Sequence, residues 1–294
     1  MITPFNALYR LVPPSPPSGY FSLTFKSILR FLLLRLLLNL ALYGVLYEKR
    51  GTATFDREVL RSQNLPSCVI GVVHSCMMLF PSYKLLRAAP LRMMSTVSKN
   101  GVSEGWVQKL TAVVSFTTSY MIQDFVFLLY SVALHDGLTS DILLYMLHHF
   151  ATLYYMSYVI RLNAGHYSSL ILMYFGELTN PFQNTVESCK VIRSICGDYA
   201  KIQSFAGAVG QCNPGFVNAL EYVESTSRLI LTPLYITIRT AIGPVIVLYM
   251  GYEFFYLKTG ARAGYVVSAS WVAMGAAVVA GSVGFVGDLW HGRF

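Results

Sequence analysis

The stretch YMLHHFATLYYMSYVI, Tyr145 to Ile160, is typical of a helix that crosses a membrane, yet two adjacent histidines lie inside it. A charged side chain at the centre of a membrane helix costs about 2.5–3.5 kcal/mol on insertion scales. Polar residues at such depth therefore face other helices or water, and mark candidate functional sites. His148 and His149 are for this reason the first residues to explain.

The composition of the whole chain is that of a multi-span membrane protein. Of 294 residues, 54% are hydrophobic and only 12% are charged, whereas soluble domains carry about 25% charged residues. Apolar stretches of about 20 residues recur along the chain. Backbone polar groups in lipid must be paired within the protein, and the runs lack the alternation of transmembrane strands. The spans are therefore expected to be helices.

We predict an all-α, polytopic membrane protein with about seven transmembrane helices. The predicted spans are residues 23–47, 66–86, 111–134, 141–162, 167–181, 229–257 and 264–290. Residues 1–64 would form an N-terminal lead-in, the first transmembrane helix and a loop, and residues 65–294 a core with a long loop at 182–228. Lysine and arginine residues number 11 on one side of the predicted membrane and 9 on the other, which leaves the orientation open.

Polar side chains inside the predicted spans fall on single helix faces. Thr152 follows His148 by four residues and His149 by three, and Asp124 follows Tyr120 by four. The candidate residues of a polar-lined cavity are His74, Tyr120, Asp124, His148, His149, Thr152, Glu177, Asn180 and Arg239. The alternative is that these groups only bond to one another and hold the helices together.

For the histidine pair we predict one specific contact. His148 or His149, with Thr152, is expected to face the bundle interior within reach of Asp124 or Glu177. Adjacent residues differ by about 100° on a helix, so one imidazole should point to the centre and the other toward a neighbouring helix. The same geometry makes adjacent histidines poor chelators, so no metal is expected, and no cofactor motif is present.

The charge and the cysteines narrow the choice of partners further. The net charge is +8, but without a clustered basic patch or aromatic platform it fits anionic lipid surfaces rather than nucleic acid. The five cysteines form no CxxC pair and are expected to be reduced, with a disulfide between two of them left open. They are Cys68, Cys76, Cys189, Cys196 and Cys212.

Within the predicted 182–228 loop, GFVNALEYVESTSRLIL has helical periodicity. Phe216, Leu220 and Val223 recur at helical spacing, with Glu221 and Glu224 off that face. This pattern predicts either an amphipathic helix at the membrane interface or a plain loop helix.

Several of these motifs, in their order, resemble the TLC-domain family. That family includes the ceramide synthases, the translocating-chain-associated membrane proteins and a branch of lipid-homeostasis proteins. HHFATLYYMSYVI followed by GELTNPFQNT carries the resemblance, and IGVVHSCMMLF, SYMIQDFVFLLY and LYITIRTAIGPV are similar to His-, Asp- and Arg-bearing helices of the lipid-homeostasis branch. It covers about Leu65 to Trp290. It implies a six-helix core around a central cavity, most often in the endoplasmic reticulum.

The resemblance also implies alternatives for function. His148 and His149 match the pair that serves acyl transfer from acyl-CoA in ceramide synthases. Those enzymes carry an HDxSD-like motif in the next helix, where this chain has GELTNPFQN. The resemblance therefore favours the non-synthase branch, with a protein that binds or handles a lipid in membrane-lipid homeostasis.

Two other functions stay open. One is an acyl-CoA-dependent lipid acyltransferase in which His148 or His149 acts as general base or acyl acceptor, oriented by Asp124 or Glu177. The other is an accessory subunit of a larger membrane complex, contacting its partners through the N-terminal segment, Arg35 and the 182–228 loop. The acid-free, arginine-containing N-terminus resembles a mitochondrial transit peptide, so the mitochondrial inner membrane is the alternative location.

Overall fold

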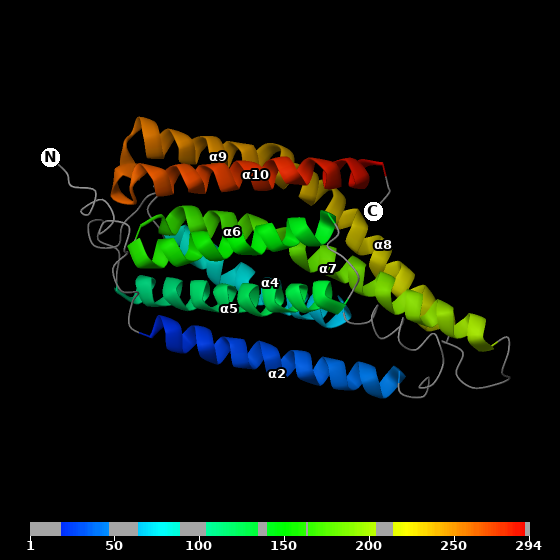
Figure 1. The fold of residues 1–294 in the computed structure, drawn as a ribbon. Coiled ribbons are helices and arrows are strands. Elements are labelled where there is room, and N and C mark those ends of the chain that lie inside the picture. The colour runs from blue at the N-terminus through cyan, green and yellow to red at the C-terminus, as the bar shows by residue number, and fades with distance from the viewer. Residues whose placement is uncertain are drawn as a thin grey trace. The chain divides into compact units, whose positions relative to one another are not determined.

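The computed structural model in Figure 1 describes residues 19–46, 64–88, 104–134, 140–162, 164–203 and 214–291. Within these residues the chain is all-α. The helices are α2 (Tyr20–Leu46), α4 (Asn64–Ala88), α5 (Glu104–Leu134), α6 (Ser140–Leu162), α7 (His166–Gln203), α8 (Pro214–Ile236), α9 (Gly243–Gly251) and α10 (Tyr265–Trp290). Two π-helical segments, η2 (Thr237–Ile242) and η3 (Tyr252–Tyr256), flank α9, and η4 (Thr259–Arg262) is a short 3₁₀ helix. Of the predicted N-terminal region, residues 1–64, the stretches 1–18 and 47–63 lie outside the described part.

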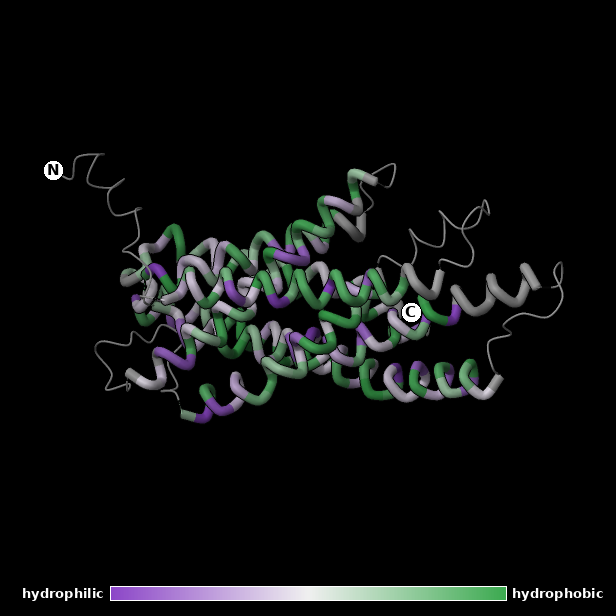
Figure 2. Tube along the Cα trace, turned by 90° about the horizontal axis from the view of Figure 1, so that it is seen from below, coloured by the Kyte–Doolittle hydropathy of each residue, from purple (hydrophilic) through white to green (hydrophobic). Residues whose placement is uncertain are grey.

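The helices are long and apolar enough for a polytopic membrane protein. Among the described residues, four helical segments suffice by length and hydropathy to cross a membrane: Leu65–Ala88, Gln108–Tyr130, Gly215–Tyr256 and Tyr265–Gly287. Figure 2 shows apolar residues along the helices with hydrophilic ones interspersed. The predicted all-α membrane architecture is thus confirmed, while seven crossings stay a prediction.

The chain divides into two compact units, each assembled from several stretches of sequence. Unit 1 takes Met1–Ile28, Phe80–Phe175 and Ile238–Phe294, and unit 2 takes Leu29–Leu79 and Gly176–Thr237. Unit 1 therefore contains α5, α6, α9 and α10. Unit 2 is built from the larger parts of α2, α4 and α7 with α8.

Unit 1 has a core of aromatic and aliphatic side chains from α6, the α9–η3 run and α10. Trp271 is 1% exposed and packs edge-on against Tyr155, with ring centroids 4.7 Å apart. The ring centroid of Phe254 lies 6.2 Å from that of the same indole. The Tyr155 hydroxyl is bonded to Ser168 Oγ at 2.6 Å, which links α6 to the first turn of α7.

Gly165, in the turn between α6 and α7, is required by two constraints. Its φ is +76°, and a Cβ added there would lie 2.7 Å from Cζ3 of Trp271. An L-residue would thus be strained in the turn and would also displace the central indole of unit 1.

The segment predicted as a loop at residues 182–228 is largely helical, and α8 contains the helix expected from GFVNALEYVESTSRLIL. Helix α7 continues past Pro181 to Gln203, and α8 begins at Pro214. Pro181 does not end the helix, and one turn later Thr185 Oγ1 donates to the Pro181 carbonyl at 2.7 Å. Membrane helices tolerate proline because Ser and Thr side chains and neighbouring helices satisfy the freed backbone groups.

On α8 the apolar face of the predicted amphipathic pattern is largely exposed, and an acidic residue, Glu224, is the buried one. Glu224 is 5% exposed, whereas Phe216 and Val223 are 49% and 43% exposed. Its carboxylate lies 2.9 Å from Nη2 of Arg193 on α7 and 2.6 Å from Nη2 of Arg228. The two guanidinium groups offset the desolvation of the carboxylate, so the acidic residue faces α7.

Replacing Gly165 by alanine is expected to destabilise unit 1 by about 1–3 kcal/mol, from positive-φ strain and the contact with Trp271. Thermal unfolding of the purified protein in detergent, followed by the helical circular dichroism signal, measures this. Gly176→Ala is the matched control, because no atom lies within 4 Å of its added Cβ. An equal loss in both variants would contradict the assignment.

Candidate functional site

The first polar cluster lies in unit 1, between the neighbouring helices α5 and α6. Nε2 of His149 is 3.1 Å from Oδ2 of Asp124, and the two residues are 5% and 9% exposed. Each belongs to a largely hydrophobic helix of a membrane protein, and lipid offers no partner for either group. The predicted contact between one histidine of the pair and Asp124 is therefore confirmed.

The second ring nitrogen of His149 is engaged within its own helix. Nδ1 lies 2.8 Å from the carbonyl oxygen of Tyr145, one turn earlier. A carbonyl oxygen only accepts, so Nδ1 carries a hydrogen. Nε2, the other ring nitrogen, faces Oδ2 of Asp124 at 3.1 Å. His149 thus links α5 to α6 and presents no ring nitrogen to a ligand in this arrangement.

His148 occupies a different environment from its neighbour. The two imidazole rings are 5.8 Å apart between centroids and nearly perpendicular, at 88°. His148 is half-buried, as is Thr152 one turn further along α6. Of the two histidines, His148 is therefore the more accessible, in line with the divergence predicted for adjacent helical positions.

The second cluster lies in unit 2, where α4 meets α7 around the carboxylate of Glu177. Ser75 Oγ donates to Oε2 of Glu177 at 2.5 Å, and Nδ2 of Asn180 donates to the same oxygen at 3.1 Å. Nδ1 of His74 lies 3.5 Å from this oxygen. His74, Ser75 and Glu177 are all at most 5% exposed. The carboxylate is held by three side chains from two helices.

Ser75 is the cluster member absent from the predicted site. Serine is common in membrane helices and is not costly to bury, so its type alone carries little signal. Its position next to His74 could have indicated it, because residues 74 and 75 both face the α7 side of α4. Gly71, one turn earlier, lets α7 approach: a Cβ there would lie 2.7 Å from Nδ2 of Asn184.

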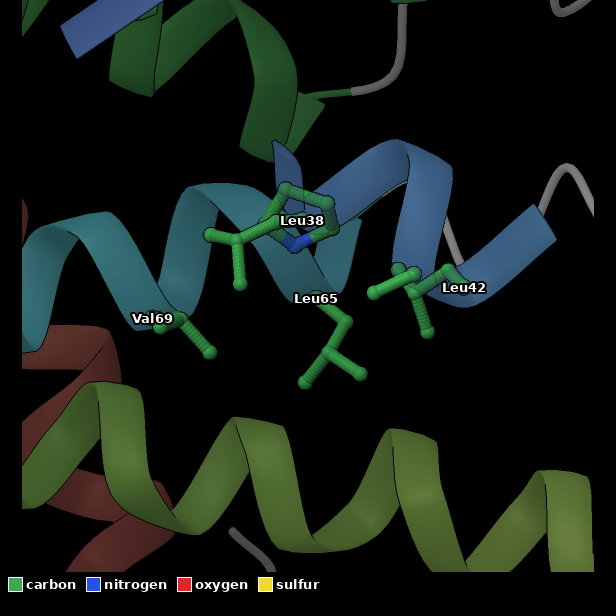
Figure 3. A pocket seen from close by; sticks show the side chains of 6 residues that line it. Leu38, Leu42, Leu65 and Val69 are labelled. Atoms are coloured by element: carbon green, nitrogen blue, oxygen red, sulfur yellow. The ribbon is translucent and has the colours of Figure 1, made fainter. Parts of the chain in front are cut away.

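Arg35 is also engaged inside unit 2. It is 3% exposed, and its Nη2 donates to Ser67 Oγ in the first turns of α4 at 2.8 Å. In the described structure this side chain joins α2 to α4. Close by, an apolar pocket of about 190 Å³ is lined by Leu38, Ala41 and Leu42 of α2 and by Leu65, Pro66 and Val69 of α4 (Figure 3).

The remaining predicted site residues lie near these clusters along their own helices or in η2. Tyr120 is buried one turn before Asp124 on α5, and Arg239 is half-buried in η2. The structure thus brings Asp124 to His149, and His74 to Glu177 and Asn180. That all the predicted residues line one cavity stays a prediction. Cys68, Cys76 and Cys189 carry free thiols, and the side chains of Cys196 and Cys212 lie outside the described part.

One of the comparisons with known proteins identifies the family of the chain. The TLC domain shared by the TRAM, LAG1 and CLN8 proteins matches residues 64–280. The chain therefore belongs to the TLC-domain family, as an integral membrane protein. Neither the curated proteins nor the solved structures gave a match.

The pair of Asp124 and His149 predicts an asymmetry between the two histidines. His149→Ala should destabilise the protein by about 3–5 kcal/mol, because it leaves the Asp124 carboxylate buried without its partner. His148→Ala should cost clearly less. Thermal unfolding in detergent compares them, with the exposed His291→Ala as control.

A double variant separates loss of the pair from loss of packing. Asp124→Leu combined with His149→Leu should recover much of the stability lost in His149→Ala, since no buried charge remains. Equal destabilisation by His148→Ala and His149→Ala would argue against the Asp124–His149 pair as the link between α5 and α6.

Proposed function

We propose that this TLC-domain protein binds or handles a membrane lipid within its helical bundle, in membrane-lipid homeostasis. The observation that carries the proposal is the buried Asp124–His149 pair, with the more accessible His148 beside it on α6. Polar groups held at this depth offer hydrogen bonds to a lipid headgroup, where apolar helix faces accept its acyl chains.

The proposed division of labour follows from accessibility. His148 and Thr152 lie one turn apart and are both half-buried, so they are the groups that meet the polar part of the lipid. His149 and Asp124 position them by fixing α6 against α5. The proposed location is an endomembrane, with the endoplasmic reticulum as first choice and the mitochondrial inner membrane as the alternative.

Lipid mass spectrometry on the protein purified in mild detergent tests the proposal. We expect one lipid class to be retained in stoichiometric amount through detergent exchange. Its retention should fall several-fold in His148→Ala and in Thr152→Val, which remove donors without opening the Asp124–His149 pair. His291→Ala serves as the matched histidine control.

The outcome that contradicts the proposal also identifies its rival. If no lipid is retained above the detergent background while protein partners co-purify in stoichiometric amount, the chain acts as an accessory subunit of a membrane complex.

The second candidate function is an acyl-CoA-dependent lipid acyltransferase, favoured by the position of the histidine pair in the TLC domain. Two observations weigh against it. Both ring nitrogens of His149 are engaged, and Glu177 and Asn180 occupy the segment that resembles the place of the synthase motif. We expect the purified protein to form no ceramide from a sphingoid base and acyl-CoA. Turnover that His149→Ala abolishes would establish the enzyme instead.

A further inference from the structure

Exposed aromatic side chains gather around the turn that joins η3 to α10 in unit 1. Tyr249, Tyr252, Phe255, Tyr256 and Tyr265 are 41%, 48%, 42%, 73% and 50% exposed. None of them belongs to the polar clusters described above. Such a concentration of exposed rings on one hairpin indicates a contact surface.

Three of these tyrosines form one stacked column, here called the tyrosine column. The rings of Tyr249 and Tyr252 are 6.5 Å apart and inclined by 25°, and those of Tyr252 and Tyr256 are 5.0 Å apart and inclined by 18°. Phe255 stacks on Tyr265 at 6.4 Å, which ties the start of α10 to η3. The rings are thus held in place before any partner arrives.

The turn next to the column has the character of a span end. The apolar segments stop at Tyr256 and resume at Tyr265. Between them Lys258 adopts a left-handed conformation, with φ of 56°, and Thr259 Oγ1 donates to the Glu253 carbonyl at 2.6 Å. The chain reverses direction over polar residues, as it does where a hairpin leaves the hydrocarbon layer.

The far end of α10 carries a matching residue. Trp290, its last residue, is 73% exposed, and Tyr265, its first, is 50% exposed. At about 1.5 Å per residue the two ends are roughly 38 Å apart. That length exceeds the roughly 30 Å hydrocarbon core and falls just short of a bilayer with its headgroups. The exposed positions between them include Val266, Ala273 and Val283, which suit acyl chains.

We propose that the end of the tyrosine column nearest the turn, Tyr252 and Tyr256, forms with Tyr265 a binding surface for the ester-carbonyl and headgroup layer of the bilayer, with Trp290 in the opposite layer. Tyrosine and tryptophan suit this layer because an apolar ring meets the acyl chains while a hydroxyl or indole N–H bonds to carbonyl and phosphate oxygens. The surface sets the depth of the α9–α10 hairpin. It stands apart from the proposed lipid site at His148.

Depth measurements with nitroxide labels test the surface directly. Single cysteines are placed at Val245, Leu248, Tyr256, Lys258 and Val283 of a variant whose native cysteines are replaced and whose helical content is unchanged. The protein is reconstituted in phosphatidylcholine vesicles with a fraction of phosphatidylglycerol. We expect the labels at Val245, Leu248 and Val283 to be accessible to oxygen, which partitions into the hydrocarbon. The label at Lys258 should be accessible to the water-soluble nickel reagent. The label at Tyr256 should show a depth between these two groups.

Two outcomes would overturn the proposal. One is a Tyr256 label as deep in the hydrocarbon as that at Leu248. The other is a Tyr256 label open to water in vesicles but shielded from both reagents in native membranes, which would assign the surface to a protein partner.

A substitution pair adds a measurement that does not need labels. Tyr252→Leu with Tyr256→Leu keeps apolar area but removes the rings and hydroxyls. It should lower the unfolding midpoint in lipid nanodiscs by several degrees relative to wild type and leave the midpoint in detergent nearly unchanged. Tyr222→Leu, at an exposed position of α8, is the control. An equal shift in detergent and nanodiscs would mean that the column only supports the fold.

Discussion

The contact between His149 Nε2 and Asp124 Oδ2 is the interaction on which the rest of unit 1 depends. Two groups that could ionise are placed inside apolar helices, where water is not at hand to solvate them. They are stable there only as a pair, and forming the pair fixes the rotation of α6 against α5. Once that rotation is set, Tyr155 is directed to Trp271 and the aromatic core can close. A polar constraint thereby decides how the apolar faces pack.

The same requirement governs unit 2 with different residues. The Glu177 carboxylate is buried between α4 and α7 and is satisfied by Ser75 and Asn180, with His74 nearby. Helix association in lipid gains little from the hydrophobic effect, since acyl chains are as apolar as leucine, so close packing and hydrogen bonds hold the helices. Gly71 provides the close approach and Glu177 the bonds. The contact between α4 and α7 therefore depends on the glycine as well as on the charged residue.

The sequence predicted those features that follow from position along one helix. It indicated the apolar segments. It also indicated that one of two adjacent histidines would meet Asp124 or Glu177, because the cost of burying an imidazole in a membrane helix can be judged from that helix alone. It did not predict the burial of Glu224, which depends on Arg193 from another helix. It also ended the fifth span at Pro181, whereas the helix continues to Gln203. The burial of Glu224 was missed because its partner is distant in sequence.

The geometry separates the roles of two histidines that one motif presents as equivalent. A buried ion pair contributes little net stability over a well-packed apolar pair, yet removing one partner is costly. His149 is therefore fixed by Asp124 and Tyr145, and any reaction at its ring would have to break the α5–α6 link first. His148 does not take part in the Asp124–His149 contact, and its ring lies nearly perpendicular to that of His149. On the function proposed above, His149 holds α6 in place, and His148, the more accessible of the two, meets the lipid.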